Sequence, residues 1–116
     1  MSLAIRRGWV YLADLNPRQG TEPGKVRPVL VVQTDLLNET HPSTIVCPLT
    51  TKVIPNVSLV RVHVRHGIAG LERDYDVMVD QIRTIDVRRL IKALGALPEP
   101  LFRQVRSNLV VLLEWS

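Results

Sequence analysis

The 116-residue sequence is poor in cysteine, and Cys47 is its one thiol. A single cysteine excludes an intramolecular disulfide and any zinc or iron–sulfur site built from several thiolates. The residues beside it, 45–49, are otherwise apolar, so we expect a buried, unreactive thiol rather than a nucleophile. This cysteine content is typical of a protein from a reducing compartment.

Long hydrophobic runs are also missing. Uncharged apolar stretches such as 29–32 and 109–113 are far shorter than the roughly 20 residues that a membrane-spanning helix needs. The apolar part of residues 8–14 is too short and too interrupted for a secretory signal peptide. We therefore expect no membrane association and a cytoplasmic location.

Size and composition predict a single domain over residues 1–116. Hydrophobic residues make up 46% and charged residues 22%, which are ordinary globular values that exclude disorder, collagen and coiled coil. A chain of this length buries about two thirds of the surface that it exposes when unfolded. A second independent core is not expected.

The charge of the chain is basic, with a formal net charge of +4. Twelve of its 15 basic residues are arginine. A guanidinium is a planar fork that matches the oxygens of a phosphate in two places, which a lysine ammonium cannot do. The composition is thus compatible with a nucleic-acid partner, and equally with a solvated basic surface.

Strand-like segments separated by turn residues predict a mainly β protein, built as a small barrel or sandwich, with one terminal helix. The run 28–33 is continuously apolar, as in a central strand buried on both faces, and Thr34 is placed to cap a short helical turn through Leu37. Residues 17–28, rich in proline, glycine and charge, should form a long exposed loop. The expected strands are 8–15, 28–33, 43–49, 58–64, 76–79 and 90–94, the last ended by Gly95, and the helix carries the apolar stripe Leu101, Val105, Leu109 and Leu112.

The loop before the second strand holds the first candidate site. Gly20 and Gly24 allow tight turns and close approach to a ligand, and Glu22 and Arg27 supply opposite charges five residues apart. Because Pro28 restricts the residue before it to an extended conformation, Arg27 should be anchored at the edge of a strand. A plain salt bridge between the two charges is the structural alternative.

Two further segments carry polar groups that could bind a phosphate. Thr50 and Thr51 end the third strand, where their hydroxyls can donate to phosphate oxygens or simply cap the following loop. The segment 80–86 combines carboxylates, an amide and a guanidinium. A surface pair of Arg83 with Asp86 would be the structural alternative, worth less than about 1 kcal/mol.

In their order and spacing these segments resemble the MazF/PemK family of toxins, over nearly the whole chain from residue 8 to about 110. The matching motifs are Gly8-x-Val10, Asp14-Leu15-x-Pro17, Gly20-x-Glu22, Arg27-Pro28-Val29, Asn38, Pro48-Leu49-Thr50, Asp80-Gln81-x-Arg83-Thr84-Ile85-Asp86 and Arg89-Leu90. The resemblance implies an SH3-like barrel with a terminal helix, a homodimer, and metal-independent cleavage of single-stranded RNA that requires no cofactor. It also implies an antitoxin of the MazE kind, whose acidic, disordered tail binds the basic cleft.

The resemblance also implies roles for particular residues. Arg27 matches the family's catalytic arginine and Thr50 its catalytic threonine, while Glu22 matches an acidic position and would orient the arginine or accept the 2′ proton. Some family members have a histidine and an arginine where this sequence has Thr21 and Met78, which favours this set over Asp80 as the base. The residues expected to contact RNA around this set are Gly20, Thr21, Lys25, Pro28, Thr51, Lys52, Asp80, Gln81 and Arg83.

Other candidates and functions are weaker. The spacing of His63 and His66, with His41 in a distant loop, does not suit catalysis by a pair of imidazoles, and no third ligand nearby suggests a metal site. Trp9 could stack on a base or lie in the core. Because one fold can host several functions, a gyrase poison, suggested by Trp115, and a barrel that binds RNA without cutting it remain the alternatives to an endoribonuclease.

Overall fold

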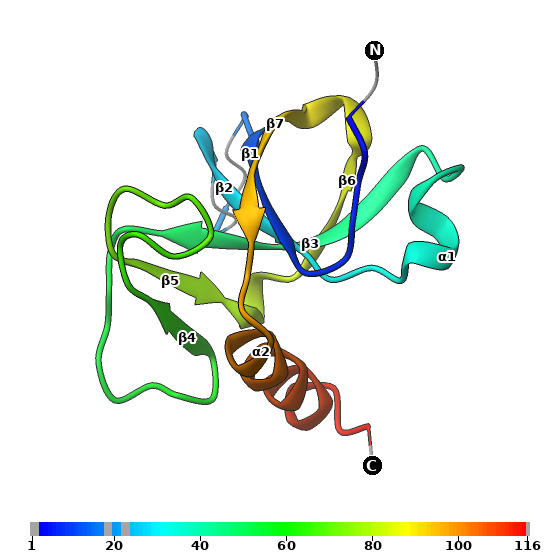
Figure 1. Cartoon of the computed structure of the whole chain (residues 1–116). Helices are drawn as coiled ribbons and strands as arrows, with labels where there is room; N and C mark the ends of the chain where they lie inside the picture. Colours follow the sequence, from blue (N-terminus) through cyan, green and yellow to red (C-terminus); the bar gives the residue numbers. More distant parts are fainter. Residues whose placement is uncertain (1–2, 18–19, 22–23, 116) are drawn as a thin grey trace.

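The computed structural model describes residues 3–17, 20–21 and 24–115. These residues form seven strands, two α-helices and two 3₁₀ turns (Figure 1). In chain order the elements are β1 (Trp9–Asp14), β2 (Val26–Val31), α1 (Asp35–Asn38), β3 (Ser43–Thr50), β4 (Arg61–Val64), β5 (Tyr75–Met78), η1 (Val79–Gln81), β6 (Arg83–Asp86), η2 (Val87–Arg89), β7 (Leu90–Ala96) and α2 (Glu99–Leu112). The predicted mainly β fold with a C-terminal helix is confirmed.

The strands form one antiparallel sheet in the order β4-β5-β3-β2-β1-β7. The long strand β3 pairs with β2 along one edge, while its other edge pairs first with β6 and then, nearer its end, with β5. Because these two partners lie end to end on one strand, the sheet divides there and curves (Figure 1). Strands β4 and β7 end the order without pairing to each other in the described part of the chain, so the fold is barrel-like rather than closed.

Two apolar clusters lie on opposite faces of the central strands. Leu30 of β2 belongs to the cluster that packs against Phe102 and Val105 of α2, whereas Val29 and Val31 belong to the other cluster. The prediction that this strand is buried on both faces is therefore confirmed. The amphipathic α2 is also where the 4-4-3 spacing places it, and no helix in the described ranges is long and apolar enough to cross a membrane.

Several boundaries differ from the predicted ones. Strand β4 begins at Arg61 rather than residue 58, because the amides of Val60 and Arg61 both donate to the carbonyl of Val57 in a turn. Gly95 lies within β7 and does not end it. A Cβ at that position would come within 2.7 Å of the carbonyl carbon of Ala69, so this glycine permits close backbone packing. Strand β6 was not predicted.

The thiol of Cys47 is fully buried, as predicted. Burial, with a smaller contribution from the charge of Asp80, raises the pKa of this thiol to about 12. At pH 8 such a pKa leaves roughly one thiolate in 10⁴ molecules. We therefore expect a thiol reagent to label the native protein very slowly and the urea-unfolded protein at once, as measured by absorbance; rapid labelling of the native protein would contradict this burial.

Candidate functional site

Arg27 lies at the beginning of β2, beside the end of β3. The two strands are paired at Val29 and Pro48, and continuing this antiparallel register by two residues places Arg27 opposite Thr50. The Arg27 side chain is half-buried, and its Nε donates to the carbonyl of Gly24 at 3.0 Å. Its Nη1 donates to the carbonyl of Leu49 at 3.2 Å. The guanidinium is therefore held next to the peptide bond that leads into Thr50.

Thr50 is the last residue of β3 and is also half-buried. Its Oγ1 accepts a hydrogen bond from the amide of Lys52 at 3.2 Å, which fixes the turn that follows the strand. A hydroxyl that accepts a bond keeps its own proton as a donor. Thr50 can thus cap the loop and donate to a ligand simultaneously, so the two predicted roles do not compete.

Arg27 and Thr50 border one small cavity of about 140 Å³, which we call the Arg27 pocket. Its walls come from the start of β2, the end of β3 and the start of β5, and the lining residues are Lys25, Val26, Arg27, Pro28, Leu49, Thr50, Thr51 and Tyr75. A guanidinium, an ammonium and two hydroxyls provide hydrogen-bond donors for an anion. The pocket is suited to a phosphate group.

Five of the predicted site residues, on two segments of the chain, meet in this pocket: Lys25, Arg27, Pro28, Thr50 and Thr51. Lys52 follows in the exposed loop and does not line it. Gly20 and Thr21 lie in an exposed turn of the loop before β2, where Gly20 has a φ of +57°. The prediction for Glu22 falls outside the described residues.

The third predicted segment lies elsewhere along β3. Arg83 of β6 is opposite Val46, four residues before Thr50, which corresponds to about 13 Å of strand. Asp80 and Gln81 occupy the turn η1 between β5 and β6. None of the three lines the Arg27 pocket.

The loop before β2 is held at its base by hydrogen bonds from Arg89. Its Nη1 donates to the carbonyls of Asp14 at 3.0 Å and Asn16 at 2.6 Å. The amide of Lys25 donates to Oδ1 of Asn16 at 2.7 Å. Arg89 therefore holds the start of the loop, and Asn16 joins that start to Lys25, two residues before Arg27. Spacing in the sequence did not predict this role.

Other motif residues have structural positions. The buried amide of Asn38 bonds to the side chains of Gln33, Asp35 and Thr44, so it holds α1 against β3. Trp9 is partly buried beside the second apolar cluster, which agrees with the core alternative, and the guanidinium of Arg6 lies 5.7 Å from its ring centre.

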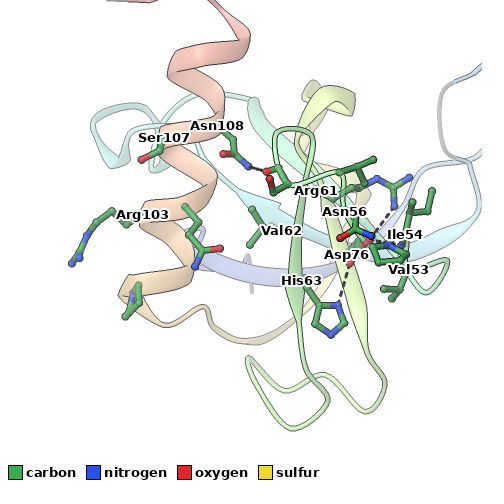
Figure 2. Close-up of a pocket in the computed structure, with 15 residues that line it drawn as sticks. Val53, Ile54, Asn56, Arg61, Val62, His63, Asp76, Arg103, Ser107 and Asn108 are labelled. Atoms are coloured by element: carbon green, nitrogen blue, oxygen red, sulfur yellow. Dashed lines mark hydrogen bonds and ion pairs between the residues drawn. The ribbon is translucent and has the colours of Figure 1, made fainter.

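Asp76 is a further polar residue near the site that sequence reasoning did not select. It lies on β5 directly opposite Thr50 and is 1% exposed. Its carboxylate accepts from the amide of Ile54 and the guanidinium of Arg61, and it lies within hydrogen-bond distance of His63 (Figure 2). The sequence does contain a signal for this residue, namely a carboxylate within an otherwise apolar strand. A charge buried in this way requires partners.

A family model described as "PemK-like, MazF-like toxin of type II toxin-antitoxin system" matches residues 6–113. The chain belongs to this family. The match covers every strand and helix of the fold described above, including the Arg27 pocket.

Relatives of this PemK/MazF-like chain agree with that assignment. Endoribonuclease EndoA of Bacillus subtilis (strain 168) is 37% identical over 111 residues, which make up 96% of each protein. MazF from Deinococcus radiodurans has a TM-score of 0.85 at 24% identity, over 97% of this chain and 99% of that one. In the MazE-MazF complex from the same organism the matched chain has a TM-score of 0.81 at 25% identity, over 99% of this chain and all of that one.

Proposed function

We propose that this PemK/MazF-like chain is an endoribonuclease toxin that cleaves single-stranded messenger RNA at selected sequences, independently of the ribosome. The observation that carries the proposal is the meeting of Arg27 and Thr50 in one donor-rich pocket at the ends of β2 and β3. The 37% identity to a protein named as an endoribonuclease supports it.

The proposed reaction is a transesterification within the RNA chain. The ribose 2′ oxygen forms a bond to the adjacent phosphorus as the bond from phosphorus to the 5′ oxygen breaks. The 2′-hydroxyl loses its proton to a base, and the leaving 5′ oxygen gains one. The products are a 2′,3′-cyclic phosphate and a 5′-hydroxyl, and the reaction needs neither a metal nor a cofactor.

Arg27 would stabilise the negative charge that builds up on the phosphorane. Its guanidinium is already positioned by the carbonyls of Gly24 and Leu49, so little reorganisation is needed when the phosphate enters the pocket. An arginine is always protonated and therefore cannot serve as the base. Thr50 would donate a further hydrogen bond to the phosphate, and Glu22 would orient Arg27 or take the 2′ proton.

The partners follow from the same basic surface. We propose that RNA also contacts the exposed segments around the pocket, namely Gly20 and Thr21 before it and Lys52 after it, with Asp80, Gln81 and Arg83 beside the middle of β3. A MazE-like antitoxin with an acidic, disordered tail would compete for this surface, since such a tail resembles RNA in charge. The active form would be a cytoplasmic homodimer.

The decisive experiment compares two short RNA oligomers in the presence of EDTA, one of them with 2′-deoxyribose at the cut site. We expect cleavage of the ribose oligomer to a 2′,3′-cyclic phosphate and no cleavage of the other. Equal cleavage of both would disprove the mechanism. Binding without cleavage would support a barrel that binds RNA without cutting it, and inhibition of gyrase with no effect on RNA would support a poison.

A further inference from the structure

The carboxylate of Asp76 is held by groups from three places in the chain. Its Oδ2 accepts from the amide of Ile54 at 2.9 Å and from Nη1 of Arg61 at 3.4 Å. Its Oδ1 lies 3.2 Å from Nδ1 of His63. Because a buried carboxylate is costly unless it is paired and hydrogen-bonded, this arrangement holds its neighbours in place.

Asp76 lies next to the Arg27 pocket, because Tyr75, the residue before it on β5, lines that pocket. It is directly opposite Thr50 on β3 and directly opposite His63 on β4. Directly opposed residues of antiparallel strands lie on the same face of a sheet. Together with Arg27, opposite Thr50 on β2, they form a polar row across four neighbouring strands. Neighbouring strands are about 4.8 Å apart, so the buried Asp76 lies directly beside Thr50, which lines the pocket.

The segment that Asp76 binds begins immediately after Thr50. Residues 51–57 are all exposed, and Val53, Ile54 and Val57 expose 39%, 42% and 36% of their surface. A segment that buries so little apolar surface has little local stability of its own. The bond from Ile54 to Asp76 therefore holds its middle, and Nη1 of Arg61 holds its beginning by donating to the carbonyl of Lys52 at 3.2 Å.

This segment also forms one wall of a second, larger groove of about 900 Å³. The opposite wall is the exposed side of α2, with Arg103 and Asn108, and the edge of β4 lies between them (Figure 2). Nδ2 of Asn108 donates to the carbonyl of Ser58 at 2.8 Å, which joins α2 to the end of the connection between β3 and β4. The segment that Asp76 fixes thus lies between the two cavities, because Thr51 lines the Arg27 pocket and Val53 lines the groove.

We propose that Asp76 is a positioning residue that holds residues 51–57 in the conformation that receives RNA next to Thr50. This inference rests on the proposed function and adds a determinant of substrate binding. Asp76 touches no reacting atom, so its loss should raise KM and leave kcat nearly unchanged. A free segment would have to be ordered each time RNA binds, which lowers affinity.

The test compares Asp76→Asn and Asp76→Ala with Glu72→Gln, which changes an exposed carboxylate four residues away. In Asp76→Asn an amide oxygen can still accept from Ile54, but the charge that pairs with Arg61 is lost. We expect KM to rise about tenfold in Asp76→Ala and less in Asp76→Asn, with kcat within about twofold of the wild type. The Glu72→Gln control should behave as the wild type.

A second variant tests the hydrogen bond from Ile54 to Asp76, which we call the tether, separately from folding. Ile54→Pro removes the backbone donor to Asp76 and leaves the buried carboxylate in place. We expect it to raise KM as Asp76→Ala does and to lower the thermal unfolding midpoint by less than Asp76→Ala, because the carboxylate keeps Arg61 and His63 as partners. If Ile54→Pro and Asp76→Asn are both folded and have the KM of the wild type, the proposal is wrong. A kcat that falls in proportion to the fraction of folded protein would likewise overturn the proposal in favour of a merely structural role.

Hydrogen exchange distinguishes a failure here from a failure of the proposed function. In Asp76→Ala the amides of residues 51–54 should exchange at least about tenfold faster than in the wild type, while those of β2 are unchanged. Unchanged hydrogen exchange in residues 51–54 would overturn the positioning role, whatever the kinetics of RNA cleavage. Faster exchange in a protein whose wild type cleaves no RNA would confirm the tether and reject the endoribonuclease.

Discussion

Arg27→Ala should lower the rate of RNA cleavage by about 10²- to 10³-fold or more, because it removes the charge that we propose stabilises the phosphorane. The variant should still fold. It loses two side-chain hydrogen bonds to the carbonyls of Gly24 and Leu49, at a cost of about 1–3 kcal/mol of unfolding free energy. Single-turnover cleavage, measured well below the unfolding midpoint, separates the two effects.

Two further variants control this experiment. Arg106→Ala removes an exposed arginine on α2 that lines neither the Arg27 pocket nor the larger groove, and it should cleave RNA normally. Arg27→Lys keeps the charge without the fork and should be intermediate, because an ammonium cannot bind two phosphate oxygens in the same geometry. Normal cleavage by Arg27→Ala would remove the basis of the proposed mechanism.

Thr50→Ala should lower cleavage by roughly 10²-fold, since it removes the hydroxyl that we propose donates to the scissile phosphate. The amide of Lys52 loses its acceptor as well, but this amide lies in an exposed loop where water can replace the hydroxyl. The unfolding free energy should therefore change by less than about 1 kcal/mol. Cleavage rates and urea unfolding of the same preparation test both statements.

The matched variants for this position are Thr50→Ser and Thr84→Ala. Serine keeps the hydroxyl and should restore most of the activity. Thr84 is exposed on β6, opposite Ile45 of β3, and its replacement should have no effect on cleavage. If serine is as inactive as alanine at position 50, the hydroxyl is not the group that matters.

Elements with strong local patterns were predicted well. The run of apolar residues in β2, the 4-4-3 stripe of α2 and the cap at Thr34, whose Oγ1 accepts from the amide of Leu36, all appear in the structure. Each follows from contacts between residues close in sequence, or from a face that must be buried. Strand β6 was missed because its four residues, Arg83–Asp86, have a weak pattern, and the strand exists through pairing with the distant start of β3.

The candidate site shows the same division. The types and order of the polar residues were enough to suggest phosphate chemistry and the family, because a guanidinium and a hydroxyl have the same donors wherever they lie. Which of them meet is a matter of strand register, and register depends on side-chain packing over the whole sheet. Pairing of β2 with β3 brings Arg27 to Thr50. Because β5 and β6 pair with successive parts of β3, Asp76 rather than Arg83 lies beside that threonine.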